Sequence, residues 1–268
     1  MIPLKDDNPT LHFPVVTIVL IALNVLVFLW QMSGAGAQHE KVLRFAAIPF
    51  NLTQGDREVG YLEERDRRGQ VVDYRPVVFE RGQRPDAPGF LPSALPAWAT
   101  LLSSMFMHGG LMHILGNMLF LWIFGNNVED AMGRVRFLVF YLLTGLAASA
   151  AHVFSNPESV IPTLGASGAV SGILGAYLVL YPRAQVLALI PLGVVMMTQR
   201  LPAVLFLGLW FAMQIFSLLG AQAGVAWYAH VGGFAVGAAL IKLFESAEHR
   251  GRGPHRPAFR SRSFQRPW

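Results

Sequence analysis

The feature that most constrains this chain is a series of six predominantly apolar runs separated by polar connections. A lipid bilayer has a hydrocarbon core of about 30 Å, which a helix of about 20 apolar residues can cross. Charged residues make up only 14% of the sequence, well below the share of about 25% in soluble domains. The sequence therefore predicts an all-α polytopic membrane protein with six transmembrane helices. The runs occupy residues 14–30, 111–124, 137–154, 168–181, 202–219 and 226–244.

The first apolar run could be a retained helix or a secretory signal sequence, since residues 35–37 (Ala-Gly-Ala) resemble a cleavage site. The segment before the run, however, carries Lys5 followed by Asp6 and Asp7, which is a poor positive n-region. We therefore predict a retained transmembrane helix over residues 14–32.

Positively charged residues in the short connections orient the helices, because such residues favour the cytoplasmic side. The connections after the second and fourth runs contain Arg134, Arg136, Arg183 and Arg200, whereas those after the third and fifth contain no lysine or arginine. Both termini are therefore predicted to be cytoplasmic, and the expected location is the bacterial cytoplasmic (inner) membrane. The predicted segments are a cytoplasmic N-terminus at 1–13, a first helix at 14–32, an extracytoplasmic loop at 33–98, a core of five helices at 99–245 and a basic cytoplasmic tail at 246–268.

Two polar segments have more than one interpretation. The tail carries six arginines and no acid between residues 250 and 266. This pattern is typical of a solvated segment beside membrane lipids, and no nucleic-acid partner is predicted. The first loop contains a polar insert at about 51–88 that is rich in charge and proline. We interpret the insert as a tolerated surface insertion, with a substrate- or partner-binding element as the alternative.

Two further features concern the connections between the helices. The segment 184–197 is apolar but is interrupted by Pro191 and Gly193, so a loop lying at the membrane is predicted there. Glu129 and Asp130 are expected in the connection between the second and third helices. On this interpretation no acidic side chain lies inside a span.

A small set of polar side chains remains inside the predicted helices, where each is costly and needs a reason. The second helix opens with His108, His113 and Asn117, the fourth opens with Ser167, and the sixth has His230 near its start. All three helices are predicted to run inward from the outer face. These side chains are therefore expected at similar depth in the outer half of the membrane.

The fourth run is short, because a helix of fourteen residues spans only about 21 Å. Its start and the preceding loop are therefore expected to dip into the membrane and to form a buried pocket around Ser167. Gly165 is expected to let this loop turn into the helix, and Gly168 to keep the surroundings of the serine open. Small residues four apart, such as Gly233 and Gly237, favour close approach of the fourth and sixth helices.

Ser167 and His230 have the chemistry of a nucleophile and its general base, since a serine hydroxyl needs a base and an imidazole titrates near neutral pH. Without a carboxylate in the membrane, they are expected to act as a dyad. Backbone N–H groups at the helix start, and His113 and Asn117 on one helix face, are candidate donors to an oxyanion. His108 and His113 lack the spacing of a zinc-protease helix motif, and neither a metal nor a cofactor is predicted.

Three motifs, MHGGLMHILGNM, GASGAVSG and AHVGGFAVG, resemble those of the rhomboid intramembrane serine proteases, also in their order along the chain. The resemblance extends from the second predicted helix to the sixth and implies a rhomboid-like fold. It implies Ser167 as nucleophile and His230 as general base. It also implies His113 and Asn117, with the Ser167 amide, as the oxyanion hole, and a supporting role for His108. Family substrates are transmembrane helices cut near their outer ends, so transmembrane proteins are the expected partners.

Ser171 departs from the family pattern, in which an aromatic residue four positions after the serine stacks on the catalytic histidine. Phe234 or a residue from another helix is expected to hold the ring of His230 instead. The alternative function is a catalytically inactive relative that binds transmembrane helices, although such relatives typically lack the serine or the histidine. A transporter would normally show charge inside the membrane or repeated halves, and this chain shows neither. No oligomeric state is inferred.

Overall fold

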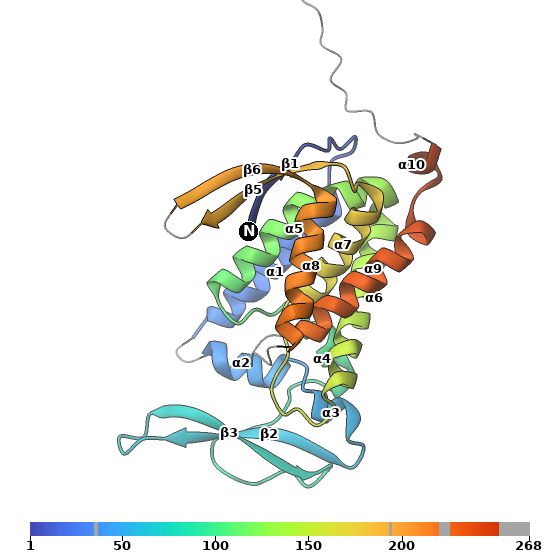
Figure 1. The fold of residues 1–268 in the computed structure, drawn as a ribbon. Helices are drawn as coiled ribbons and strands as arrows, with labels where there is room; N and C mark the ends of the chain where they lie inside the picture. The colour runs from blue at the N-terminus through green and yellow to red at the C-terminus, as the bar shows by residue number, and fades with distance from the viewer. Residues whose placement is uncertain (35–36, 193–194, 220–225, 252–268) are drawn as a thin grey trace, which may run out of the picture.

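The computed structural model describes residues 1–34, 37–192, 195–219 and 226–251. Its helices form a bundle with a small antiparallel sheet at each end (Figure 1). One end carries the N-terminal strand and α10 (Ala247–Gly251), and the other carries the segment between the first two long helices. The expectation of an all-α chain is therefore wrong for the segments that form these sheets. Most of the basic tail, from residue 252 onwards, lies outside the described residues.

The bundle contains helices of two lengths. Within the described residues, the long helices that are apolar enough to cross a membrane are α1 (Val15–Met32), α5 (Leu111–Met132), α6 (Arg134–Ser155) and α9 (Trp227–Phe244). Two shorter apolar helices are α7 (Ser167–Leu180) and α8 (Ala203–Leu219). Each of these helices overlaps one of the predicted apolar runs.

Helix α7 lies at the centre of the bundle, where it contacts α5, α6, α8 and α9. Every residue from Gly168 to Tyr177 is buried. Glycines in α9 let that helix approach the backbone of α7 closely. A Cβ atom added to Gly237 of α9 would lie 2.0 Å from the backbone oxygen of Gly172. One added to Gly233 would lie 2.2 Å from the backbone oxygen of Gly168. The predicted close approach of these two helices is confirmed.

The N-terminus of α1 is capped by a carboxylate from the end of α5. Glu129 is 3% exposed and accepts hydrogen bonds from the backbone N–H groups of Val16 (2.9 Å) and Thr17 (2.7 Å) and from the Thr17 hydroxyl (2.8 Å). Asp130 accepts two further backbone hydrogen bonds just before α1. The expectation that both acids lie in a connecting loop is wrong. Helix α5 can continue to Met132 because the unpaired N–H groups and the positive dipole end of α1 compensate the buried charge.

The first sheet has the order β1-β5-β6 and consists of β1 (Ile2–Asp6), β5 (Gln185–Leu192) and β6 (Val195–Pro202). Val186 and Ala188, two positions apart in β5, are fully buried and belong to the bundle core. This period of two is typical of a strand with one buried face. The loop predicted at the membrane is therefore a β-hairpin, and Gly193 lies outside the described residues.

Asp6 ties the N-terminal strand to the end of α7. Its carboxylate accepts hydrogen bonds from the Tyr177 hydroxyl (2.5 Å) and the Asn127 amide (2.8 Å). Burial raises the pKa of Asp6 from 3.8 to about 6, although both hydrogen bonds oppose the rise. The folded protein therefore holds this proton more tightly than the unfolded chain. The resulting stabilisation is complete below pH 3.8 and is lost as the pH rises through about 6.

We expect Asp6→Asn to remove this pH dependence. The wild type should lose thermal stability between about pH 4 and pH 7, whereas the amide, which cannot ionise, should lose less over the same range. Thermal unfolding of both proteins in detergent micelles, measured across this range, gives the difference. A wild-type melting temperature that falls no more steeply than that of Asp6→Asn would contradict the prediction.

The polar insert is folded, and its sheet has the order β3-β2-β4. Strand β3 is therefore an edge strand, where proline is tolerated because no outward N–H is needed. This position explains how Pro76 of β3 can pair opposite Tyr61 of β2. The elements of this segment are α2 (Ala37–Phe45), α3 (Pro49–Thr53), β2 (Arg57–Arg65), β3 (Val71–Glu80), β4 (Phe90–Leu91) and α4 (Ala97–Ser104).

The insert packs against the loop 156–166, which leads into α7. The Tyr61 hydroxyl donates a hydrogen bond to the carbonyl oxygen of Val160 at 2.5 Å. The Thr53 hydroxyl donates to the carbonyl oxygen of Pro157 at 2.6 Å. The insert therefore holds the backbone of the loop that leads into α7 at two points.

Candidate active site

Ser167 and His230 meet at the end of the bundle that carries the insert. Ser167 is the first residue of α7, and His230 lies in the first turn of α9. The Ser167 hydroxyl oxygen is 2.8 Å from Nε2 of His230. This is a hydrogen-bond distance, so the chain brings these two side chains into the contact that a nucleophile and its base require.

The loop before α7 turns into the helix at Gly165. Its φ of +127° is one that residues with side chains rarely adopt, and its N–H donates to the carbonyl oxygen of Ser104 (2.8 Å). A Cβ atom here would lie 2.8 Å from Nε2 of His113 and 3.5 Å from the Ser167 hydroxyl oxygen. Gly165 therefore leaves open the space between His113 and Ser167.

His113 and Asn117 provide hydrogen-bond donors beside the serine. Nδ1 of His113 accepts the backbone N–H of Gly109 at 3.3 Å, so the neutral ring carries its proton on Nε2, the atom nearest Gly165. Asn117 is 8% exposed, and its Nδ2 has no hydrogen-bond partner among the described residues. Both side chains line a cavity of about 420 Å³ together with Ser167 and His230. The cavity thus combines a serine hydroxyl, an imidazole and two side chains that can donate hydrogen bonds.

His108 packs against His113. It is completely buried, and its ring packs edge-on against that of His113 with centroids 5.1 Å apart. Its backbone N–H donates to Oε1 of Gln31 (3.0 Å), and its carbonyl oxygen accepts from Nε2 of the same glutamine (3.2 Å). Helix α1 therefore fixes the backbone of the segment that positions His113.

The structural role of Gly168 differs from the expected one. A Cβ atom on it would lie 2.6 Å from the Cβ atom of Ala148 in α6 and 3.9 Å from that of Ala229 in α9. The missing side chain thus faces two neighbouring helices. Gly168 permits helix packing, and the expectation that it keeps the space around the serine open is wrong.

The sequence interpretation missed Gln214. This residue of α8 is 7% exposed, and its Oε1 lies 2.8 Å from Nδ1 of His230. The rings of Trp227 and Trp210 lie beside the imidazole, with centroids 5.8 Å and 6.3 Å away. Gln214 is the only amide side chain in α8, so a polar residue inside an apolar helix was the signal that could have identified it.

Ser171 and Phe234 are engaged elsewhere. The Ser171 hydroxyl donates to the carbonyl oxygen of Ser167, one turn earlier, at 2.6 Å. Phe234 stacks on Phe211 with ring centroids 4.3 Å apart, and on Trp210 at 6.2 Å. Of the two expected substitutes for the missing aromatic residue, the structure thus favours a residue from another helix.

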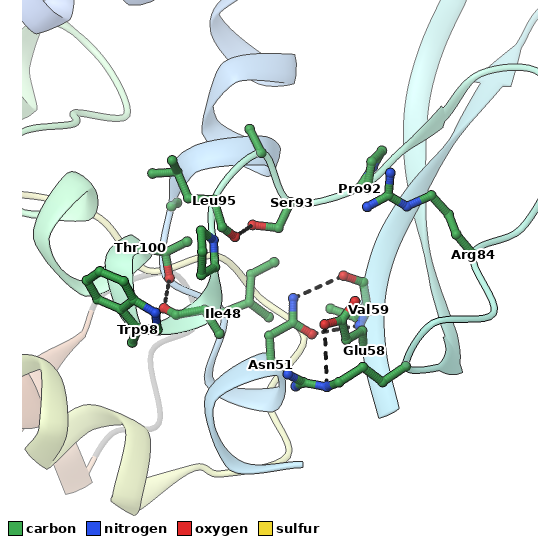
Figure 2. A pocket seen from close by; sticks show the side chains of 15 residues that line it. Ile48, Asn51, Glu58, Val59, Arg84, Pro92, Ser93, Leu95, Trp98 and Thr100 are labelled. Carbon is green, nitrogen blue, oxygen red and sulfur yellow. Dashed lines mark hydrogen bonds and ion pairs between the residues drawn. The ribbon is translucent and has the colours of Figure 1, made fainter. Parts of the chain in front are cut away.

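A second cavity, of about 580 Å³, lies between the insert and α4. Figure 2 shows its lining side chains, which come from α3, β2 and α4 and the loops beside them. Several of its polar groups are paired with one another: the Asn51 side chain binds the backbone of Val59, and Arg81 lies 3.5 Å from Glu58. No histidine belongs to its described lining, so it lacks the serine–histidine pair of the first cavity.

Acidic and histidine side chains do not gather into a candidate metal site in the described part of the chain. Within residues 1–34, 37–192, 195–219 and 226–251, no three of them are placed to hold an ion together.

Comparison with known proteins gives one family. A profile of the rhomboid domain matches residues 96–246. The chain is 34% identical over 145 residues to Rhomboid protease GluP of Bacillus subtilis, a match covering 53% of this chain and 26% of that protein. It is 33% identical over 137 residues to RHOMBOID-like protein 4 of Arabidopsis thaliana (51% and 32%). It is 34% identical over 92 residues to Rhomboid protein 1, mitochondrial, of Saccharomyces cerevisiae (33% and 27%). The chain thus spans about a quarter to a third of these relatives.

Proposed function

The chain belongs to the rhomboid family of integral membrane proteins, and from this premise we propose that it is an intramembrane serine endopeptidase acting through Ser167 and His230. The observation that carries the proposal is the 2.8 Å contact between the Ser167 hydroxyl oxygen and Nε2 of His230. It lies in a cavity that His113 and Asn117 also line. A catalytically inactive relative would have no need of this arrangement.

The first half of the proposed reaction forms an acyl-enzyme. The Ser167 hydroxyl oxygen attacks the carbonyl carbon of a substrate peptide bond while its proton passes to Nε2 of His230. The carbonyl oxygen becomes an oxyanion, which the N–H groups of His113 and Asn117 stabilise. His230 then returns the proton to the leaving nitrogen as the C–N bond breaks, which releases an amine and leaves an ester on Ser167.

The second half releases the new carboxyl end. A water molecule attacks the ester carbon while His230 takes one of its protons. The same donors stabilise the second oxyanion. The C–O bond to Ser167 breaks, and the serine oxygen regains the proton from His230. The sum of the two halves is hydrolysis of one peptide bond.

We also propose the arrangement of this site in the membrane. Helices α1 and α5 to α9 cross the bilayer as six spans, with both termini in the cytoplasm of a bacterium. The proposal is supported by Arg134, Arg183 and Arg200, which lie in the connections predicted to be cytoplasmic. The insert within residues 33–98 is then extracytoplasmic. Substrates on this proposal are transmembrane proteins, cut near the outer face.

A reactive probe tests the function. The purified protein, reconstituted in liposomes with a single-span model substrate, is expected to cleave that substrate and to react covalently with a fluorophosphonate at Ser167. Peptide mass spectrometry locates the modification, and His230→Ala is expected to prevent it because the hydroxyl then has no base. Retained substrate binding without cleavage or modification would favour an inactive rhomboid-like protein that binds transmembrane helices.

A further inference from the structure

Gln214 is the side chain of α8 that reaches the imidazole of His230. We propose that Gln214 is the positioning residue of His230 and fixes the tautomer in which Nε2 accepts the Ser167 proton. The inference rests on the proposed function, because it concerns the same site. Its starting observation is the 2.8 Å distance between Oε1 of Gln214 and Nδ1 of His230.

A backbone carbonyl decides which end of the Gln214 amide faces the histidine. Nε2 of Gln214 lies 3.3 Å from the carbonyl oxygen of Trp210, one turn earlier in α8. A carbonyl oxygen can only accept a hydrogen bond, so the NH₂ group must point towards Trp210. The amide oxygen, which also can only accept, is thereby directed at His230.

The orientation of the amide fixes the proton on the ring. Because Gln214 presents an acceptor, Nδ1 of the neutral imidazole must carry the proton. Nε2 then has a free lone pair, and it lies 2.8 Å from the Ser167 hydroxyl oxygen. Donors and acceptors therefore run in one direction, from the serine through the histidine and the glutamine to the carbonyl oxygen of Trp210.

A neutral amide suits this place better than a carboxylate. Gln214 is 7% exposed in an apolar helix, where a charged group would carry a large desolvation cost. The edge-on ring of Trp227 limits rotation of the imidazole from one side. Together these contacts orient His230 without an aromatic residue at position 171. The residue there is Ser171, whose hydroxyl donates a hydrogen bond within its own helix.

The test measures activation of Ser167 apart from substrate binding, through the rate of fluorophosphonate modification of the reconstituted protein. Gln214→Met keeps the length of the side chain but removes the acceptor, and is expected to slow modification by about 10²-fold. Gln214→Glu retains an acceptor for Nδ1 but places a costly carboxylate in an apolar helix, so it is expected to react faster than Gln214→Met and more slowly than the wild type. Met213→Leu, at a neighbouring side chain that is 46% exposed, is the control and should react at the wild-type rate. Cleavage by Gln214→Met should show a lower kcat with little change in KM.

Nitrogen-15 NMR of the imidazole gives an independent readout. In the wild type, the ring signals that vanish in His230→Ala are expected to show a protonated Nδ1 and an unprotonated Nε2, whereas Gln214→Met should lose this preference. The opposite wild-type tautomer would overturn the inference even if the protein proved inactive. An active wild type whose modification rate is unchanged in Gln214→Met would also overturn it while leaving the proposed function intact.

Discussion

Replacement of Ser167 by alanine is expected to reduce cleavage of a transmembrane substrate by more than about 10³-fold. The hydroxyl that His230 contacts at 2.8 Å is then missing, so no acyl-enzyme can form. The helix itself should tolerate the change, because alanine is the best helix former. The measurement is the initial cleavage rate in liposomes, with thermal unfolding as the check that the bundle remains folded.

Ser171→Ala is the matched control for this prediction. Its hydroxyl lies one turn further along α7 and donates to the carbonyl oxygen of Ser167 at 2.6 Å. A hydroxyl bonded within its own helix contributes little to the reaction, so the rate should stay within a few-fold of the wild type. Cleavage that survives Ser167→Ala but is lost in Ser171→Ala would show that Ser167 is not the nucleophile. This result would refute the proposed mechanism.

The contact of Ser167 with His230 could be predicted from the sequence because it depends only on the depth of each residue and on which helices touch. Span boundaries and the direction of each helix place both residues at similar depth. Glycines four apart then imply that α7 and α9 touch, which the Gly237–Gly172 approach confirms. Depth and contact together bring two side chains into one pocket without any knowledge of loop structure.

Gln214 could not be paired with His230 in the same way. The two residues are 16 positions apart, on helices joined by residues 220–225, and their contact depends on how α8 is rotated about its axis. A single amide residue in an apolar run does not define that rotation. Glu129 illustrates the opposite difficulty: its charge suggested a loop, and only the N-terminus of α1 explains why it is buried in α5.

The strands were missed for another physical reason. Strand β3 is an edge strand, so it tolerates Pro76 and three exposed charged residues that would disfavour a central strand. The charge and proline of this segment therefore predict a polar surface insertion and give no sign of strands. The insert is ordered by the pairing of β3 with β2 and by the hydrogen bond from Tyr61 to Val160. Tyr61 and Val160 are 99 positions apart. Contacts of this range are not visible in local sequence.

Gly237→Ala is expected to have the second largest effect, because it separates the helices that carry the dyad. The added Cβ atom would lie 2.0 Å from the backbone oxygen of Gly172 and 2.6 Å from its carbonyl carbon. Backbone atoms cannot rotate away as a side chain can, so α9 must move outward. A shift of about 1 Å at a reacting pair can cost about 10²-fold in rate. Overpacking of this kind should also destabilise the fold by about 1–3 kcal/mol.

Gly208→Ala is the control for Gly237→Ala, because it makes the same glycine-to-alanine change in a helix without a steric clash. This glycine lies in the interior of α8, and a Cβ atom there would meet nothing within 4 Å. Since alanine stabilises a helix relative to glycine, this variant should keep or raise the melting temperature and retain the wild-type cleavage rate. Gly237→Ala should lose both, and its fluorophosphonate modification should slow in parallel because Ser167 and His230 are no longer in contact. Equal melting temperatures and rates in the two variants would mean that α7 and α9 can separate without cost, and that their close approach does not hold the dyad together.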